Sequence, residues 1–411
     1  MAAQPGPPLD AGDALALTER LVERIRAVGG LRDPAWHAAF ARVPRAAFVP
    51  FFYAPAPGGG HERLWRDDRD PRRRARWAEG VASDRPLATR LRDGELLSSS
   101  SRPSLMARML ESLRIGDAGG GARHHGGAGP RVLEIGTGTG YNAALLGHRL
   151  GDGRVTTVDV DPVITEAARR HLAAAGRRPH VVTGDGFLGC RARAPYDRII
   201  ATCAVPLVPP PWIEQTVPGG LILTPLATGL LALRVAEGGR ACGRFAPVPA
   251  CFVPLRGGAV PGPGPGHPRD AEGPGTAGTP GPAGDFDFLL ALAGAVPARG
   301  PDGRPEPATG PEPGNGHGPD PGNGHGNRPG HGSGAGHGNS VSDGHGPGRR
   351  ELFALWQAAG RPGRERFGVA VSAGGRQWAW LDDPDGPHTW PLGRPAAGGG
   401  SGEGTAVAPG A

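Results

Sequence analysis

A glycine-rich turn is the first feature of this sequence that could do chemistry. It lies in VLEIGTGTGYNAALL at residues 132–146, where a short apolar run leads into the glycines and a helix-like run follows. Glycine lets the backbone approach a ligand closely, and the first N–H groups of a helix are free to bind one. Such a turn can serve a nicotinamide dinucleotide, a phosphate ligand or S-adenosylmethionine.

The spacing and neighbours of the glycines help to distinguish these ligands. Gly136, Gly138 and Gly140 give G-x-G-x-G with Tyr141 in the sixth position, whereas the dinucleotide fingerprint is G-x-G-x-x-G. A Walker loop requires a lysine, and the chain contains none. Glu134 lies just before the turn, where its charge would repel a pyrophosphate but would suit a cofactor that carries ammonium and sulfonium groups.

Two acidic residues follow at the ends of the next two strand-like segments. Asp159 ends VTTVDV, 23 residues after Gly136, where an acid usually accepts hydrogen bonds from ribose hydroxyls. Asp185, in Gly184-Asp185-Gly186, can accept from an adenine amino group. The glycines could instead only shape turns and the acids only cap helices, but the ordered series favours S-adenosyl-L-methionine. The predicted cofactor-binding residues are Glu134, Gly136, Thr137, Gly138, Tyr141, Asp159, Asp185 and Gly186.

Alternating strands and helices must position these residues. Strand-like segments cover 131–136, 155–160, 180–185, 197–205 and 220–226, and helix-like segments lie between them at 142–150, 162–176 and 208–217. This order predicts a Rossmann-like, doubly wound α/β fold with a parallel sheet, which binds ligands beyond the carboxyl ends of its strands. The same edge would carry Thr202 to Val205, which we expect to face the substrate.

Composition divides the rest of the chain. Of 411 residues, 73 are Gly and 47 are Pro, and 28 Gly and 17 Pro fall between residues 257 and 350. We predict disordered ends at 1–13 and 393–411, and a disordered Gly/Pro/His-rich linker at 257–349 with a short docked helix near 285–296. The ordered units are an N-terminal helical and substrate-binding segment at 14–118, the cofactor domain at 130–256, and a small C-terminal α+β module at 350–392, which we expect to pack on the main domain. Within these units we expect helices at 14–28, 34–42, 98–115 (capped by its leading serines) and 350–359, and a hairpin around Gly374-Gly375.

Charge and cysteine patterns argue against several functions. The formal net charge is +6, and the densest basic run, 61–92, interleaves ten arginines with six acids, which favours a solvated face over a nucleic-acid groove. The four cysteines form no CxxC pair, and the Gly-His pairs between residues 317 and 345 fit no metal-ligand spacing, so we expect no metal site. Neither a signal peptide nor a membrane span is recognisable, so we expect a cytoplasmic protein without a membrane partner.

Together these motifs resemble the protein-L-isoaspartate O-methyltransferases over about residues 14–256. VLEIGTGTGYNAALL is similar to the family's first cofactor motif, VTTVDVDP to its second, and GDGFLG, APYDRIIATCAV and PGGLILTPL to the next three. More specific is ASDRPLATRLRDGELLSSSSRPSLMARML, which resembles the family's segment ahead of the cofactor domain. The family's Thr-Ile-Ser-x-Pro core corresponds here to Ser99-Ser100-Ser101-Arg102-Pro103, so the resemblance implies that Ser101 is the catalytic serine. Ser98-Ser99 replaces the family's usual Gln-Thr or Ala-Thr pair, and residues 257–411 exceed the minimal repair enzyme.

The resemblance implies methyl transfer from S-adenosyl-L-methionine to a peptide or protein carboxylate, first of all an L-isoaspartyl group that is repaired through a succinimide. A carboxyl group with a reference pKa near 4 is already an anion at neutral pH, so Ser101 would orient it and would not act as a nucleophile. Ser99, Ser100, Thr202 and Val205 would contact the substrate, whereas we expect Cys203 to be a small buried residue.

Two alternatives remain open. SSSSRPSLMARML and WLDDPDG look more like an actinobacterial branch associated with ribosomally made peptides, which would methylate a defined Asp of a precursor peptide to give an aspartimide. The chain could also bind a cofactor or a peptide without turnover.

Overall fold

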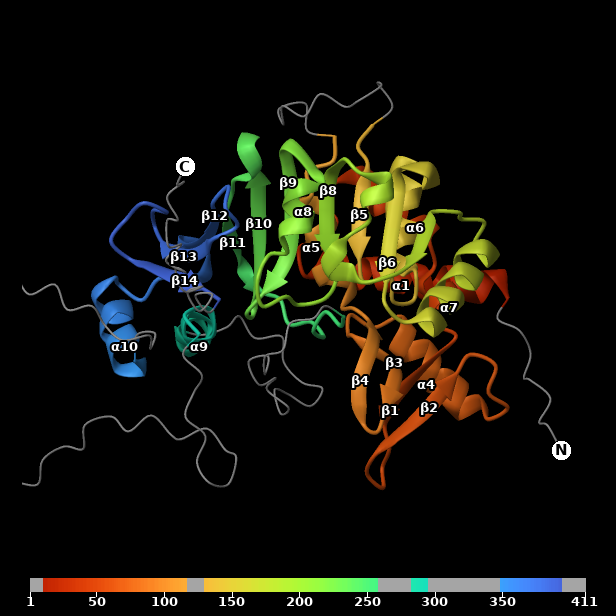
Figure 1. Ribbon diagram of the computed structural model, residues 1–411. Coiled ribbons are helices and arrows are strands. Elements are labelled where there is room, and N and C mark those ends of the chain that lie inside the picture. The colour runs from red at the N-terminus through yellow and green to blue at the C-terminus, as the bar shows by residue number, and fades with distance from the viewer. Residues whose placement is uncertain (1–9, 117–128, 258–281, 295–347, 394–411) are drawn as a thin grey trace, which may run out of the picture.

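The computed structural model describes residues 10–116, 129–257, 282–294 and 348–393, and a ten-stranded sheet runs through this part of the chain (Figure 1). In spatial order its strands are β14 (Thr389–Leu392), β13 (Gln377–Leu381), β12 (Phe367–Val371), β11 (Ala241–Pro249), β10 (Gly229–Val235), β9 (Thr216–Leu226), β8 (Tyr196–Ala201), β5 (Val132–Ile135), β6 (Val155–Asp159) and β7 (His180–Thr183). The strands from β9 to β7 pair in parallel, and those from β9 to β14 pair antiparallel. The parallel half confirms the predicted doubly wound α/β fold.

Helices cover both faces of this sheet, which is why its central strands β5, β6 and β8 are buried at nearly every position. Leu133 and Ile135 of β5 belong to one buried cluster, whereas Val132 of the same strand belongs to the other. The helices that cover the parallel half are α1 (Ala11–Ala27), α2 (Pro34–Arg42), α5 (Pro103–Ser112), α6 (Tyr141–Leu150), α7 (Pro162–Ala174) and α8 (Pro210–Glu214). Short 3-10 turns lie at Asp152–Arg154, Gly186–Leu188, Arg191–Arg193, Glu237–Gly239 and Arg364–Arg366. The helix predicted at 14–28 begins earlier, because the carboxylate of Asp10 accepts a bond from the N–H of Asp13 and so caps the helix.

The N-terminal segment contains a second sheet that the sequence analysis did not predict. Its strands, in spatial order, are β2 (His61–Trp65), β1 (Phe51–Pro55), β3 (Leu87–Arg92) and β4 (Glu95–Ser100), and α3 (Arg45–Phe48) and α4 (Pro71–Val81) pack beside them. In Figure 1 this orange sheet lies below the large one. The segment predicted as helical and substrate-binding is therefore mixed, with helices α1, α2 and α5 beside this sheet.

The serine run also differs from the prediction. Ser98 to Ser100 belong to strand β4, and α5 begins at Pro103 with Arg102 as its N-cap residue and no side-chain cap. The serines do not cap this helix, because the strand turns their side chains toward neighbouring strands and loops. The hydroxyl of Ser98, for example, lies 3.3 Å from that of Thr89 on β3.

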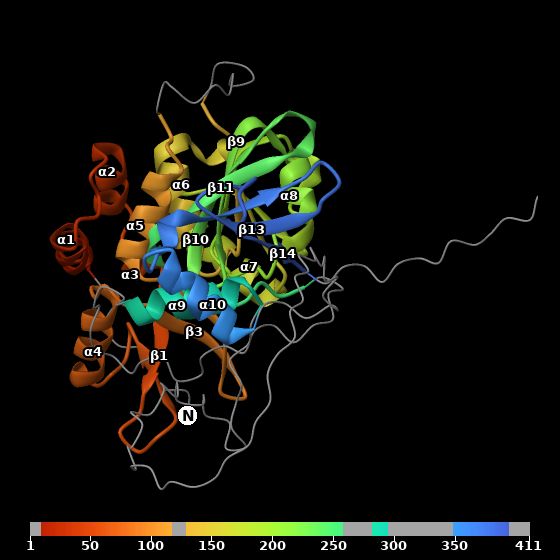
Figure 2. The ribbon, with the colours of Figure 1, turned by 90° about the vertical axis from the view of Figure 1, so that its left-hand side faces the viewer.

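The C-terminal strands are part of the main sheet and do not form a separate module. Strand β12 pairs with β11, with Ala241 opposite Val371, and all five residues of β12 are buried. Helices α9 (Pro282–Leu292) and α10 (Arg349–Ala358) lie against this end of the sheet (Figure 2). The ring of Phe288 packs against the rings of Phe245 on β11 and Phe367 on β12. The docked helix, the helix at 350–359 and the hairpin are thus confirmed, and the edge of β11 is covered.

Most of the predicted disordered ends, residues 1–9 and 394–411, and most of the predicted linker lie outside the described residues. Residues 11–13, predicted as part of the disordered N-terminus, belong to helix α1, so that boundary was wrong. Within the described ranges, no helix is long and apolar enough to cross a membrane.

Candidate functional site

One cavity brings together most of the predicted site residues. It encloses about 780 Å³ including its open mouth, and it lies at the carboxyl ends of β5, β6 and β8. This size suits a small-molecule ligand. The predicted residues that line it are Ser99, Ser100, Ser101, Glu134, Gly136, Thr137, Gly138, Tyr141, Asp159, Gly186 and Thr202.

The glycine turn joins the tips of three strands. Gly136 has φ +93°, and a Cβ on it would lie 2.8 Å from Oγ1 of Thr202, which donates a hydrogen bond of 2.7 Å to the Gly136 carbonyl. The N–H of Gly138 donates to Oδ2 of Asp159 at 3.1 Å. Only glycine fits the close approach at residue 136, so its identity sets the shape of the cavity.

Glu134 lies fully buried at the cavity wall. Its Oε1 accepts a bond of 2.8 Å from Nδ2 of Asn142, and its Oε2 accepts one of 2.6 Å from the hydroxyl of Thr157. The Thr157 hydroxyl is also bonded to that of Thr137 at 2.8 Å. Burial raises the pKa of the Glu134 carboxyl from 4.5 to about 7, although the hydrogen bonds from Thr157 and Asn142 oppose this rise.

Asp159 ends β6 with its carboxylate held by backbone groups. Oδ1 accepts from the N–H of Asp161 at 3.2 Å, and Oδ2 accepts from the N–H of Gly138 at 3.1 Å. Burial raises the pKa of this carboxyl. Each oxygen still has a second lone pair, so the carboxylate can accept hydrogen bonds from two ribose hydroxyls.

Two of the predicted residues do not line the cavity. Asp185 is the N-cap residue of the 3-10 turn Gly186–Leu188, and its Oδ1 accepts a bond of 2.9 Å from the N–H of Phe187. Val205 is 2% exposed and lies in the hydrophobic core. We therefore retain Asp185 only as a neighbour of the lining residue Gly186, and we no longer place Val205 against a substrate.

A residue that the sequence analysis missed, Arg45, holds the serine strand. Its side chain is 1% exposed, and its Nε donates to Oγ of Ser100 at 3.0 Å. Its Nη2 donates to the carbonyls of Ser100 and Ser101, at 3.0 and 3.3 Å, and its Nη1 to the carbonyl of Ser83 at 3.0 Å. Burial lowers the pKa of this guanidinium to about 10, so it stays charged at neutral pH. A buried arginine that bonds to several carbonyls fixes the backbone on which Ser101 stands.

S-adenosylmethionine fits the chemistry of this cavity. The hydroxyl of Tyr141 and Oδ1 of Asn142 are buried without a hydrogen-bond partner, and both residues line the cavity with the carboxylates of Glu134 and Asp159. Arg256 is the basic residue in the lining, and its Nη1 lies 4.0 Å from Oδ2 of Asp161. A lining with two carboxylates and unpaired acceptors favours a cationic ligand over a phosphate.

Cys203 also lines the cavity but is not suited to act as a nucleophile. Its side chain is 5% exposed, and burial strongly raises the pKa of its thiol, with the Asp159 and Glu134 carboxylates adding to the rise. A thiol in such surroundings is not ionised at neutral pH. The expectation of a small buried residue is confirmed.

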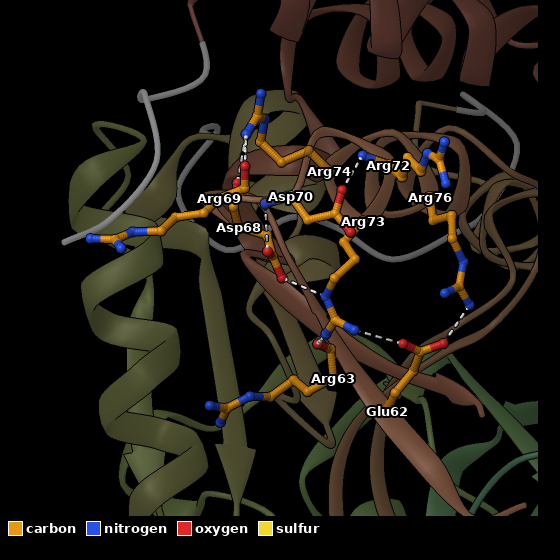
Figure 3. A network of polar contacts seen from close by, with 9 residues as sticks. All are labelled: Glu62, Arg63, Asp68, Arg69, Asp70, Arg72, Arg73, Arg74 and Arg76. Atoms are coloured by element: carbon orange, nitrogen blue, oxygen red, sulfur yellow. Dashed lines mark hydrogen bonds and ion pairs between the residues drawn. The ribbon is translucent and has the colours of Figure 1, made fainter. Parts of the chain in front are cut away.

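The basic run at 61–92 forms a paired surface network, part of which Figure 3 shows. The Glu62 carboxylate lies 2.6 Å from the guanidinium of Arg76 and 2.9 Å from that of Arg73, and Arg73 also contacts Asp68 at 2.8 Å. The hydrogen bond from Arg76 lowers the pKa of Glu62, and Arg73 adds to this effect. Arg73 and Arg76 therefore already face carboxylates.

No group of three or more His, Cys, Asp or Glu residues that could hold a metal is found among the described residues, and the predicted low-complexity histidines lie outside them.

Known proteins are similar to the part of the chain that carries this site. Residues 83–254 match the family model described as Protein-L-isoaspartate(D-aspartate) O-methyltransferase (PCMT). Over 218 residues the chain is 34% identical to a protein-L-isoaspartate O-methyltransferase of Thermococcus onnurineus. This match spans 53% of this chain and 80% of that protein. Over 249 residues it is 36% identical to the protein of the same name from Methanoculleus marisnigri, covering 58% of this chain and 91% of that protein. A solved structure of a protein-L-isoaspartate O-methyltransferase is 27% identical with a TM-score of 0.45, over 58% of this chain and 66% of the other.

Proposed function

Because the chain belongs to the protein-L-isoaspartate O-methyltransferase family, we propose that it transfers a methyl group from S-adenosyl-L-methionine to the free carboxylate of an L-isoaspartyl residue in a peptide or protein. The methyl ester can then close to a succinimide, which reopens in part to normal aspartate. This sequence of steps is protein repair.

One observation carries the proposal most directly. The glycine turn, the Asp159 carboxylate and the serine strand with Ser101 line the same cavity. The space where a Cβ on Gly138 would stand is 3.8 Å from Oγ of Ser98 and from the carbonyl oxygen of Ser99. A cofactor seated on the glycine turn would therefore have the serine strand as its neighbour, where an acceptor carboxylate can be presented.

The bound cofactor supplies a methyl group on a positively charged sulfur. The chain's residues would position the two reactants and would exclude water. Asp159 would accept from the ribose, Gly186 with its neighbour Asp185 would face the adenine, and the wall with Glu134 and Asn142 would face the ammonium group. The acceptor carboxylate is already ionised at neutral pH, so no general base is needed.

On the acceptor side, the Ser101 hydroxyl would donate a hydrogen bond to one carboxylate oxygen and leave the other free to attack the methyl carbon. Ser99, Ser100 and Thr202 would line the approach. Holding anion and cation in line within a dry cleft supplies most of the rate enhancement, because their charges neutralise each other as the new bond forms.

A labelled-methyl transfer assay tests the proposal. The full chain is mixed with S-adenosylmethionine and with two peptides of the same sequence, one with isoaspartate and one with normal aspartate. We expect label on the isoaspartyl peptide only, and a loss of about 100-fold in kcat for Ser101→Ala, the size typical of a group that stabilises a transition state. Ser112→Ala, at the far end of α5, is the matched control and should keep wild-type activity.

Other outcomes would count against repair. Label on one defined normal-Asp peptide, with none on isoaspartyl peptides, would favour the tailoring of a precursor peptide. Cofactor binding without transfer to any peptide would favour a binding protein. A cytoplasmic location and the lack of a nucleic-acid partner stay predictions.

A further inference from the structure

The loop after β8, residues 202–209, borders the cavity and then turns outward. Thr202 and Cys203 line the cavity, and the next residues pair with the segment that follows β11. The N–H of Ala204 donates to the Val253 carbonyl at 2.9 Å, and the N–H of Leu255 donates to the Ala204 carbonyl at 2.8 Å. The first half of the loop is therefore fixed by neighbouring backbone.

The second half of the loop has few backbone N–H groups that can donate hydrogen bonds. Its sequence, Pro206-Leu207-Val208-Pro209, leaves only Leu207 and Val208 with a backbone N–H. Pro206 is exposed and Leu207 is half-buried, so this turn stands at the surface. Val208 is buried, so its backbone N–H and carbonyl need hydrogen-bond partners from elsewhere in the fold.

Gln377 of β13 is that partner. Its Oε1 accepts a bond of 3.0 Å from the N–H of Val208, and its Nε2 donates one of 2.6 Å to the Val208 carbonyl. The Gln377 side chain is 5% exposed and Val208 is 0% exposed. One amide thus satisfies both backbone groups of a buried residue, and water cannot readily replace it.

This contact spans the sheet. Four strands, β9 to β12, lie between β8 and β13 in the sheet order, so the sheet must curl for β13 to reach the loop. The loop leads directly into α8, which begins at Pro210. The chain after β14 also reaches the loop, since a Cβ on Gly393 would be 3.1 Å from Cδ1 of Leu207.

We propose that Gln377 is a positioning residue, which holds the turn 206–208 as the rim against which the acceptor peptide binds. The proposal rests on the proposed methyl transfer to a peptide. Thr202 and Cys203 line the cavity, and exposed Pro206 follows Cys203 by three residues, which span at most about 11 Å. A peptide whose carboxylate lies at Ser101 and Thr202 is long enough to reach this turn with the residues that flank its isoaspartate. Gln377 lies outside residues 83–254, so the C-terminal strands of this chain would contribute to peptide recognition.

The chain offers a matched control at another loop. Gln215 is 2% exposed, and its side chain accepts from the N–H of Cys190 at 2.8 Å and donates to the carbonyl of Leu188 at 2.8 Å. It holds the segment that follows the lining residue Gly186, which we assign to the cofactor side. Gln377 and Gln215 therefore make the same kind of contact to two different loops.

The experiment compares Gln377→Met and Gln215→Met with the wild type in the full chain. For Gln377→Met we expect the KM for the isoaspartyl peptide to rise about 10-fold, while the Kd for S-adenosylhomocysteine stays within about 2-fold of the wild-type value, since two hydrogen bonds to the loop are lost. Hydrogen exchange of residues 204–208 should become faster in the same variant. For Gln215→Met we expect the reverse, a weaker Kd for S-adenosylhomocysteine and a peptide KM close to that of the wild type.

Three results would overturn the inference. An unchanged peptide KM with faster exchange at 204–208 would mean that the turn does not bind the peptide. An equal loss of peptide and cofactor binding in both variants would indicate general destabilisation. A wild-type chain that methylates no isoaspartyl peptide would overturn the proposed function, and with it the acceptor role of this turn.

Discussion

The buried carboxyl of Glu134 should make the stability of this protein fall as the pH rises. Its pKa is about 7 in the folded protein and 4.5 for an exposed carboxyl, so between these values the folded protein keeps a proton that the unfolded chain releases. The free energy of unfolding therefore decreases between about pH 4.5 and 7, and the total loss is about 3 kcal/mol at pH 8.

The variant Glu134→Gln removes this titration and can keep the hydrogen bonds. The Gln carbonyl oxygen can accept from Nδ2 of Asn142, and its amide can donate to the hydroxyl of Thr157, which can in turn donate to that of Thr137. We expect the variant to be about 3 kcal/mol more stable than the wild type at pH 8 and less than about 1 kcal/mol more stable at pH 5.

Urea unfolding from pH 5 to pH 8, without cofactor, measures this difference. Glu19→Gln, an exposed change on α1, is the control and should follow the wild type at every pH. A Glu134→Gln variant that is less stable at pH 8, or whose advantage does not depend on pH, would refute the reasoning. In a second arm, S-adenosylmethionine should bind the wild type more tightly as the pH rises through about 7, because its cationic groups favour the ionised carboxylate, and the variant should lose this dependence.

Three further predictions follow from the site and the sheet. Asp159→Asn should weaken S-adenosylhomocysteine binding by about 10- to 100-fold in calorimetry, because charged hydrogen bonds to the ribose are lost, and an unchanged affinity would contradict that role. Arg45→Lys should lower kcat by about 10-fold or more and leave cofactor affinity within about 2-fold of the wild type, because a lysine cannot replace the forked bonds to Ser100 and Ser101. A variant with wild-type kcat would show that these bonds do not matter for Ser101. A chain that ends after Gly257 should lose its cooperative unfolding transition, because the edge of β11 and the buried face shared with β12 become exposed, and a cooperative transition in circular dichroism would show that the C-terminal strands are dispensable.

The cofactor side of the site could be predicted from sequence because its signals are local. The strand, the glycine turn and the helix are consecutive, and a parallel sheet brings the residues that follow successive strands to one edge. Glu134, Gly136 and Asp159 therefore reach the same cavity, as expected. The prediction for Val205 was wrong because it depended on which side chains after β8 turn inward, and local spacing does not determine this.

The N-terminal sheet was missed for a related reason. Its strands are short, and β2 and β3 carry charged residues that do not give the alternating apolar pattern of a typical strand. They become strands because they pair with one another and bury residues such as Phe52, Leu64 and Leu87 against Trp77 of α4. The serines of β4 adopt a strand because they pair with β3, whereas the preference of serine for helix caps predicted the start of a helix.

The sequence by itself determined the class of fold, the cofactor and the place of the glycine turn, because each depends on neighbours within about thirty residues, the length of a βαβ unit. Only the tertiary structure decided three other features: the pKa of Glu134, the bonds of Arg45 to residues 55 and 56 positions away, and the contact of Gln377 with a residue 169 positions away. The physical reason is that burial and long-range pairing arise only when the whole chain has packed. The C-terminal strands were predicted as a small module packed on the main domain, and only the tertiary structure shows that they continue its sheet.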